Sequence, residues 1–266
     1  MVAFSLHGSG GSAMKDNARD NTRYEDHAIS VLGAGMGRLS EDDREAMRHL
    51  NVIHRFVGRG RLLIDEMERI THVRVVCKGW AMRSCRLDGA RRQILDFVLP
   101  GDILGLHVDG TGASICDVEA ITPCEVGEIA LPALERVALQ NKGVAAGLNS
   151  YLSRQLTQSN DQILRLGRMT AYERVSSFFM DIYARQRHLA VFQGRVDFPI
   201  TQTVVADMLG LSIVHVNRQV MRLRREGLVT LDRKQLIIHD ERRLCEVAGY
   251  RDRRFGASSS IFMAAE

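Results

Sequence analysis

The sequence contains no long apolar run. None of its segments approaches the roughly 20 apolar residues that a membrane-spanning helix needs. Its N-terminal residues include Gly and Ser but no basic segment followed by an apolar one, so no secretory signal is predicted. The five cysteines are few and odd in number, which indicates reduced thiols rather than a disulfide framework. We therefore expect a cytoplasmic protein with no membrane partner.

The sequence patterns of common enzymes are missing as well. We find no spacing typical of metal ligands, no glycine-rich phosphate-binding loop and no nucleophile elbow. We therefore predict no catalytic residue, no metal site and no bound cofactor, and we expect a binding protein rather than an enzyme.

The net charge is small but unevenly distributed. The whole chain carries a formal charge of +4, whereas residues 201–254 alone contain eleven Lys and Arg against seven Asp and Glu. This one-fifth of the chain thus accounts for the entire excess. A local basic patch of this kind favours encounters with nucleic acid.

The most informative segment is ITQTVVADMLGLSIVHVNRQVMRLRREG, residues 200–227. Thr201 is a suitable N-cap for a first helix, and Gly210 suits the left-handed residue that ends it. Ser212 can cap a second helix, which is predicted over residues 213–226, and apolar residues at helical spacing leave each helix one face to bury. Two short helices joined by a tight turn, the second of them basic, predict a helix-turn-helix that binds duplex DNA.

The second helix carries side chains suited to DNA, because in this motif its first turns face base edges in the major groove. Arg218 can pair with guanine and Asn217 with adenine, each contact giving about 1–3 kcal/mol of discrimination. Arg222 and Arg225 are expected to hold phosphates. The alternative is a helical hairpin whose basic face is only solvated. The residues predicted to contact DNA are Thr201, Gln202, Ser212, Val214, His215, Asn217, Arg218, Arg222, Arg225, Arg233 and Lys234.

Two further short runs follow this motif. Residues 228–231 and 236–239 are apolar or β-branched and flank a polar turn, which predicts a two-stranded wing. Such a wing would bring Arg233 and Lys234 close to a phosphate backbone. Asp240 is predicted to cap a last short helix.

The first half of the chain has a different pattern. Between residues 56 and 129, short β-branched runs alternate with Gly or Asp-Gly, and Asp88-Gly89 has the composition of a tight hairpin turn. Strands at this spacing predict an antiparallel jelly-roll barrel. Ahead of the barrel, Ser40 and Asp43 suit a capping box that opens a short helix ending near Leu50. The runs are 73–77, 80–87, 93–99, 115–121 and 124–129.

A long helical pattern joins the two halves, from about residue 132 to residue 167. Its apolar residues fall on a and d positions of a heptad repeat, which is typical of a two-stranded coiled coil. Because helix-turn-helix proteins commonly bind two half-sites as a two-fold dimer, we expect a homodimer. The alternative is a single amphipathic helix packed on its own barrel. The predicted interface residues are Asn149, Leu152, Leu156, Ser159, Ile163 and Leu166.

A barrel, a dimerisation helix and a winged helix-turn-helix follow one another in the CRP/FNR family of bacterial transcription regulators. This chain resembles that family over about residues 39–248. The resemblance is carried by GARRQILDFVLPGDILGL (residues 89–106) and by TQTVVADMLGLSIVHVNRQVMRLRREGLV (residues 201–229). It implies a homodimer that binds a palindromic promoter site, contacts RNA polymerase and is switched by a signal in the barrel.

The barrel departs from the ligand-binding members of that family. Leu106 and Ser114-Ile115 stand where the resemblance places the Glu and the Arg-Ser of the cyclic-AMP clamp. A cyclic phosphate would therefore lack its charge-assisted partner. No cysteine precedes Cys77, and Gly127 replaces the barrel cysteine of the iron–sulfur members. His107 is similar in position to a haem ligand, but Gly105 stands in place of the neighbouring cysteine. We expect a barrel without a cofactor.

The recognition helix departs from the family pattern too. Val214 occupies the position where most members have a Glu that accepts a hydrogen bond from cytosine, while Arg218 is kept. Val214 can instead meet a thymine methyl group. Our hypothesis is a palindrome with one G·C pair read by Arg218 and neighbours richer in A·T.

The expected protein is thus of the α+β class, with a cyclic-nucleotide-binding-like barrel, a dimerisation helix and a winged helix-turn-helix. Its expected function is that of a homodimeric, sequence-specific transcription regulator that binds a palindromic promoter site through the helix 213–226, with a barrel that binds an unknown ligand or none. The alternative is a regulator gated by a small effector, a nucleotide or haem, or by oxidation of barrel thiols. The expected divisions are a disordered tail (1–28), the barrel (29–131), the dimerisation helix (132–168), the DNA-binding domain (169–250) and a flexible tail (251–266).

Overall fold

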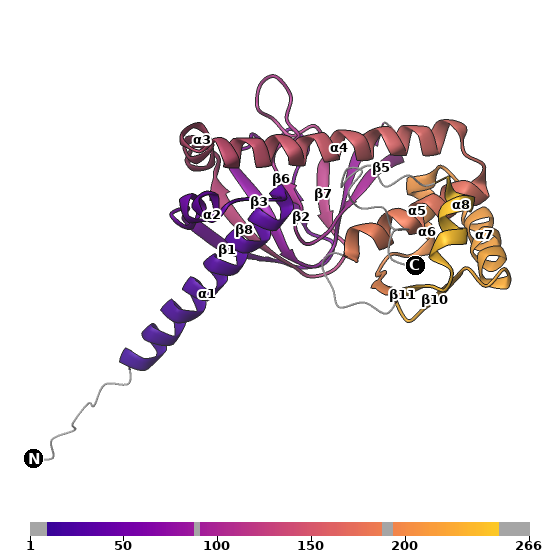
Figure 1. Cartoon of the computed structure of the whole chain (residues 1–266), viewed down its shortest axis with the longest axis horizontal. Coiled ribbons are helices and arrows are strands. Elements are labelled where there is room, and N and C mark those ends of the chain that lie inside the picture. The colour runs from indigo at the N-terminus through magenta and orange to yellow at the C-terminus, as the bar shows by residue number, and fades with distance from the viewer. Residues whose placement is uncertain (1–9, 88–90, 188–193, 250–266) are drawn as a thin grey trace, which may run out of the picture.

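The computed structural model describes residues 10–87, 91–187 and 194–249. An N-terminal β-barrel lies beneath one long helix, which leads to a smaller C-terminal domain (Figure 1). The helices are α1 (Gly10–Met36), α2 (Glu41–Arg48), α3 (Leu131–Gln140), α4 (Lys142–Arg168), α5 (Ala171–Gln186), α6 (Gln202–Leu209), α7 (Ile213–Arg225) and α8 (Glu241–Ala248). None of the described helices is long and apolar enough to cross a membrane.

The barrel consists of two four-stranded antiparallel sheets. Their strand orders are β1-β8-β3-β6 and β2-β7-β4-β5, as a jelly roll requires. Runs 73–77, 80–87, 93–99, 115–121 and 124–129 correspond to β3, β4, β5, β7 and β8. The barrel strands are β1 (Val52–Val57), β2 (Leu62–Ile64), β3 (His72–Lys78), β4 (Ala81–Leu87), β5 (Arg91–Val98), β6 (Ile103–Leu104), β7 (Asp117–Ala120) and β8 (Cys124–Ala130). The Asp88-Gly89 turn lies outside the described residues.

Two N-terminal helices close one side of the barrel. The predicted capping box is confirmed, because the Ser40 hydroxyl accepts the Asp43 N–H (3.2 Å) while the Asp43 carboxylate accepts the Ser40 N–H (2.9 Å). The prediction of a disordered tail over residues 1–28 is wrong for residues 10–28, which belong to α1. Ala28, Ile29 and Leu32 pack on the outer face of the barrel. This burial stabilises the last turns of a helix whose first turns look disordered in the sequence.

The helical pattern after the barrel is interrupted once. Residues 132–168 were predicted as one helix, but the backbone becomes extended at Asn141, whose side chain accepts the Val144 N–H (3.0 Å) and so caps α4. Met169 is also extended, and Thr170 caps α5 with Glu173 in a capping box. The chain therefore breaks between α4 and α5 at these two residues.

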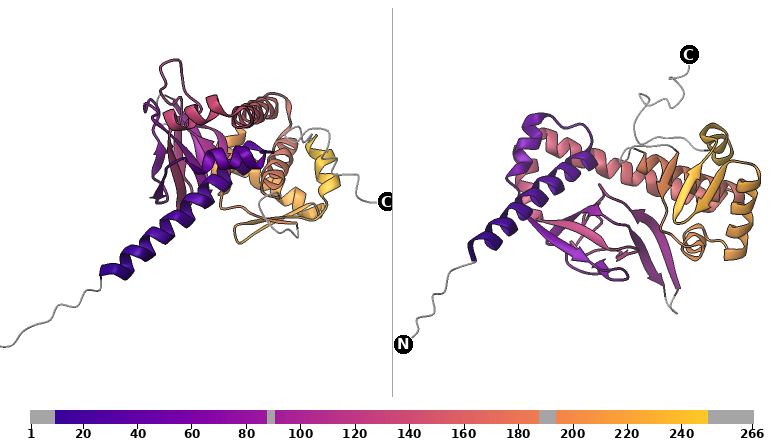
Figure 2. Two further views of the ribbon diagram at one scale, coloured as in Figure 1. Left: turned by 60° about the vertical axis from the view of Figure 1, so that its left-hand side comes forward. Right: turned by 90° about the horizontal axis from the view of Figure 1, so that it is seen from below.

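The described part of the C-terminal domain contains four helices, α5 to α8, around a small sheet, and it shares a core with the barrel. Its strands, in the order β10-β11-β9, are β9 (Arg195–Asp197), β10 (Val229–Asp232) and β11 (Gln235–Ile238). Phe97 of β5 lies 5.6 Å from Phe178 of α5, ring centre to ring centre, and Phe178 lies 6.0 Å from Phe198. One apolar cluster thus continues from the barrel into the C-terminal domain and holds the two together. Figure 2 shows the two parts side by side.

Candidate DNA-binding surface and dimerisation face

Helices α6 and α7 form the predicted helix-turn-helix. The Thr201 hydroxyl accepts the Val204 N–H (3.4 Å), and the Ser212 hydroxyl accepts the His215 N–H (3.2 Å), so both predicted N-caps are present. Gly210 ends α6 with a φ of 60°, a conformation that glycine adopts without steric cost. Asp240 caps α8 in the same way, by accepting the Arg243 N–H (2.9 Å).

The recognition helix α7 separates a buried face from an exposed one. Val216, Val220 and Leu223 are buried, as their spacing predicts. All the predicted DNA contacts are exposed except Gln202, which is half-buried. Their exposure makes them available to a groove. The exposed ones are Thr201, Ser212, Val214, His215, Asn217, Arg218, Arg222, Arg225, Arg233 and Lys234.

The outermost line of α7 alternates apolar and basic side chains. Val214, Arg218, Met221 and Arg225 recur at intervals of four, three and four residues, so they share one face of the helix. Val214 is 67% exposed. Sequence reasoning overlooked Met221, and also Ile213 in the first turn. Both could have been identified from the sequence, because they are apolar residues of α7 that do not fall on its buried face.

The arginines of α7 differ in their surroundings. Among the described residues, Arg218 and Arg225 form no hydrogen bond or ion pair through their side chains. Arg222 instead donates from Nε to Glu226 (2.8 Å), and its guanidinium lies 3.9 Å from the centre of the Tyr172 ring. The Tyr172 hydroxyl donates to the other oxygen of Glu226. Burial and this carboxylate raise the pKa of Tyr172 to about 12.

The wing turn lies beside the barrel. Arg233 and Lys234 both adopt left-handed backbone conformations, with φ of 45° and 65°. They line one side of a groove of about 510 Å³, and the barrel turn Lys78–Trp80 lines the other. Two non-glycine residues in this conformation give the hairpin the twist of a type I′ turn. Their cationic side chains are exposed at its tip.

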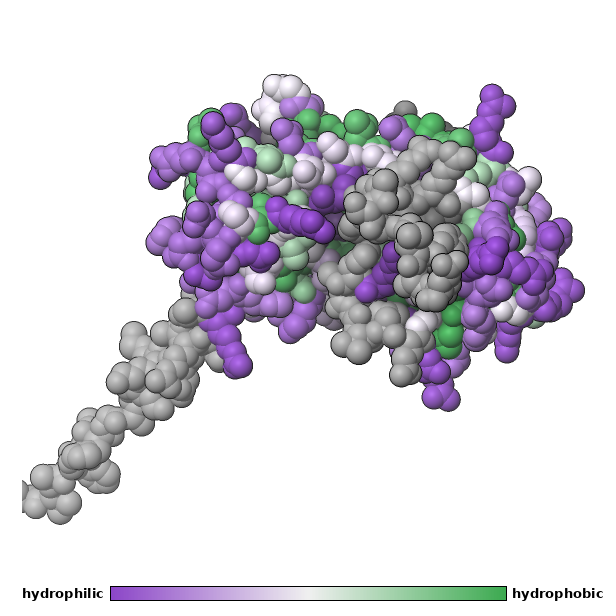
Figure 3. All heavy atoms as spheres, in the orientation of Figure 1, coloured by the Kyte–Doolittle hydropathy of each residue, from purple (hydrophilic) through white to green (hydrophobic). Residues whose placement is uncertain are grey.

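The two faces of α4 have opposite characters. The side toward the barrel buries Tyr151, Gln155, Gln162 and Arg165. The outer side exposes five of the six predicted interface residues, and Figure 3 shows hydrophobic surface along the upper edge where α4 runs. The exposed fraction is 64% for Leu156 and 69% for Ile163, with Asn149, Leu152 and Ser159 also exposed and Leu166 half-buried.

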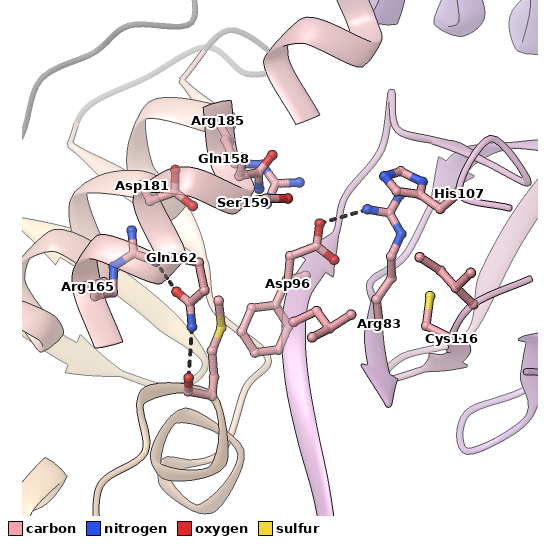
Figure 4. Close-up of a pocket in the computed structure, with 14 residues that line it drawn as sticks. Arg83, Asp96, His107, Cys116, Gln158, Ser159, Gln162, Arg165, Asp181 and Arg185 are labelled. Carbon is pink, nitrogen blue, oxygen red and sulfur yellow. Dashed lines mark hydrogen bonds and ion pairs between the residues drawn. The ribbon is translucent and has the colours of Figure 1, made fainter. Parts of the chain in front are cut away.

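A polar joint connects the barrel to α4 and to the C-terminal domain (Figure 4). Arg83 of β4 donates to Asp96 of β5 (2.7 Å) and to Gln155 of α4 (3.0 Å). Gln162 donates to the carbonyl oxygen of Met208 at the end of α6 (2.9 Å) and accepts from Arg165 (2.5 Å). Two sets of buried hydrogen bonds thus attach α4, one to the barrel and one to α6.

This joint encloses a cavity of about 60 Å³. Arg83 Nη2, Asp96 Oδ1 and His107 Nδ1 are buried there without a hydrogen-bond partner among the described residues. Burial and the Arg83 charge lower the pKa of His107 to about 3, so its ring is neutral near pH 7. Ser159, predicted in the dimer interface, lies at the edge of this cavity.

The cavity does not fit a cyclic nucleotide or haem. Ligand pockets of drug size usually measure about 300–1,000 Å³, several times the volume found here. Arg83, which the barrel buries at this cavity, is already bound to Asp96, whose second oxygen faces the cavity and would repel a phosphate. Arg165 of α4 is buried there too and donates to Gln162 and Ser177. Within the described parts of the chain, no three His, Cys, Asp or Glu side chains are grouped to hold a metal ion.

The barrel thiols are core side chains. Cys77, Cys116 and Cys124 are buried and Cys85 is half-buried, and all four are free. Burial raises the pKa of Cys116 and of Cys124 to about 11. Because the thiolate is the reactive form, these surroundings disfavour the thiol-switch alternative.

Comparison with known proteins identifies both halves of the chain. Residues 54–141 match the cyclic nucleotide-binding domain, and residues 173–247 match the Crp-like helix-turn-helix domain. The transcriptional activator FnrL of Cereibacter sphaeroides is 30% identical over 182 residues, 66% of this chain and 73% of the relative. The nitrogen fixation regulation protein FixK of Azorhizobium caulinodans is 32% identical over 174 residues, 64% of this chain and 68% of the relative.

Solved structures agree with this assignment. The structure of FixK2 from Bradyrhizobium japonicum superposes with a TM-score of 0.68 at 28% identity, covering 76% of this chain and all of that one. The chain therefore belongs to the CRP/FNR family of DNA-binding transcription regulators. Its predicted α+β architecture of barrel, long helix and winged helix-turn-helix is confirmed.

Proposed function

We propose that this regulator acts as a homodimer that binds a palindromic promoter site without a bound effector. The observation that supports the dimer is the apolar outer face of α4, since Leu156 and Ile163 are each more than 60% exposed. Apolar side chains at a and d positions are stabilised when a second copy of the helix covers them. Two copies would present two α7 helices to half-sites about 34 Å apart.

Base recognition is assigned to the first turns of α7. Arg218 has no competing partner among the described residues and can pair with the O6 and N7 of a guanine. Val214 and Ile213 are exposed beside it and can pack on thymine methyl groups, whereas neither can accept a hydrogen bond from cytosine. Asn217 and His215 are available to neighbouring bases, and Thr201, Gln202 and Ser212, at the helix N-termini, to phosphates. The proposed half-site has one G·C pair among A·T pairs.

The barrel is proposed to act without a nucleotide or haem. Support comes from the volume of the cavity and from Asp96, which competes with any anion for Arg83. A dimer bound at a promoter is proposed to contact RNA polymerase and so to raise or lower transcription.

The proposal is tested with the purified full-length protein and fragmented chromosomal DNA at near-physiological salt, with the bound fragments sequenced. A two-fold symmetric motif recovered without added ligand is the expected result. Binding that responds to salt but recovers no motif would contradict the proposed effector-free recognition.

A further inference from the structure

Arg222 lies to one side of the DNA-facing line of α7. Each residue of a helix turns the side chain by about 100°, so Arg222 is rotated away from the outermost row formed by Val214, Arg218, Met221 and Arg225. Its side chain reaches the first turn of α5, where the guanidinium stacks on the Tyr172 ring at 3.9 Å. The geometry therefore aims this arginine at the protein rather than at a groove.

The charge of Arg222 is already matched. Glu226, four residues later, accepts its Nε–H (2.8 Å), and the two side chains are 51% and 27% exposed. The Tyr172 hydroxyl donates to the same carboxylate. A phosphate at this point would have to displace Glu226 from Arg222 and then lie beside a carboxylate of like charge. No such obstacle exists at Arg225, whose side chain has no partner among the described residues.

The first turn of α5 contacts both helices of the DNA-binding motif. Arg174 donates to the Met169 carbonyl (2.9 Å), in the break between α4 and α5, and to the Leu209 carbonyl at the end of α6 (3.1 Å). Tyr172 contacts Arg222 and Glu226 at the end of α7. One turn of helix therefore joins α6 and α7 to the segment that follows the dimerisation helix.

We infer that Tyr172, Arg222 and Glu226 form a positioning clamp that fixes the orientation of the recognition helix against α5, and that Arg222 contacts no DNA phosphate. This inference rests on the proposed sequence-specific DNA binding and revises the role predicted for Arg222. Arg225 keeps its predicted role as a phosphate contact.

The substitution Glu226→Gln should change DNA affinity in opposite directions under the two possible roles of Arg222. If Arg222 held a phosphate, removing the neighbouring negative charge would strengthen binding to any duplex. As part of the clamp, Glu226→Gln weakens binding to the recovered motif roughly three- to tenfold, the size expected for one partly exposed ion pair with a cation–π contact. Binding to a scrambled duplex stays within about twofold, because non-specific binding depends on phosphates and not on helix orientation.

The matched comparison is Arg222→Gln against Arg225→Gln, with affinities measured over a series of salt concentrations. Each phosphate contact contributes about 0.9 to the slope of log K against log salt, so a dimer that loses two contacts changes by about 1.8. We expect that change for Arg225→Gln and an unchanged slope for Arg222→Gln. Tyr172→Phe, which keeps the ring and removes the hydroxyl, should reproduce part of the loss seen with Glu226→Gln.

Three results would overturn the clamp: stronger binding by Glu226→Gln, a slope change of about 1.8 for Arg222→Gln, or a double variant Arg222→Gln/Glu226→Gln whose loss is the product of the two single losses. Partners in one clamp give a double variant no worse than the poorer single one. Wild-type preference for the motif over the scrambled duplex tests the proposed function by itself. Its failure is thus distinguished from a failure of the clamp.

Discussion

The two faces of α4 reverse the usual distribution of polar and apolar side chains. The inner face buries Gln155, Gln162 and Arg165 in hydrogen bonds with the barrel, α6 and α5, whereas the outer face exposes Leu156 and Ile163. Buried polar groups are stable only when paired, so the inner face specifies one geometry between domains. An exposed apolar stripe gains stability when a partner covers it. The inner face is a joint within one chain, and the outer face is the one that we propose a second chain covers.

The largest expected effect breaks the inner face. Arg83→Met leaves Asp96 without its cation in a buried site, and losing one partner of a buried ion pair costs about 3–5 kcal/mol of unfolding free energy. Chemical denaturation measures the change. Arg48→Met is the control, because the Arg48 ion pairs on α2 are more than half exposed and should contribute under about 1 kcal/mol. Equal losses of unfolding free energy in the two variants would contradict the claim that the buried Arg83 pair contributes more stability than the surface pairs of Arg48.

The outer face is broken by Leu156→Asp combined with Ile163→Asp. Charges at two seam positions oppose burial against a second copy, so we expect a monomer and at least about a 100-fold loss of affinity for the palindrome, equivalent to about 2.7 kcal/mol. Sedimentation and DNA binding measure the two effects. Ser150→Asp, which places a charge on an exposed side of α4 away from the stripe, should remain dimeric. A dimeric double variant would contradict the proposed interface.

Acid should weaken the inner joint before it affects the outer face. The His107 ring is buried neutral, with its pKa lowered to about 3 from an unfolded value near 6.5. The unfolded chain therefore binds the proton first, and the stability this group contributes is full above pH 6.5 and declines as pH falls toward 3. Between pH 7 and pH 5 the loss approaches about 2 kcal/mol.

His107→Gln removes the titrating group and should flatten this dependence when unfolding is followed at each pH. The control substitution is His215→Gln, at an exposed residue of α7. An unchanged slope in His107→Gln would show that His107 does not titrate with the predicted shift.

The smallest expected effect concerns α7, which, like the outer face of α4, exposes apolar side chains. Replacing each motif thymine in turn by uracil removes one methyl group, worth about 0.8 kcal/mol when buried, so we expect about a three- to fivefold loss at the thymine that Val214 meets. Val214→Ala should lose this sensitivity. If no thymine responds, the apolar line does not read methyl groups.

The elements with local signals were predicted correctly. The caps at Ser40, Thr201 and Ser212 satisfy the first N–H groups of a helix through side chains three residues away at most, so neighbouring sequence is sufficient to identify them. Strands with alternating or continuous apolar patterns were found for the same reason. Strand β1 was missed because four of its six residues are exposed and its pairing partner β8 is distant in sequence.

Other features depend on contacts that no local pattern contains. Helix α1 was assigned to disorder because its first turns are polar and glycine-rich, yet its last turns are stabilised by burial on the barrel. The predicted phosphate role of Arg222 ignored Tyr172, which lies 50 residues earlier in the sequence. The sequence shows Glu226 four residues after Arg222, but it does not show that the Tyr172 ring packs against the same guanidinium.

The sequence by itself determined the class of the protein, the order of its parts, the helix-turn-helix with its caps and the apolar seam of α4, because each follows from residue spacing within one element. Only the tertiary structure decided which polar groups line the joint, how small its cavity is and which arginines of α7 are available to DNA. Burial and pairing energies come from residues far apart in the chain, whose meeting depends on how the elements pack.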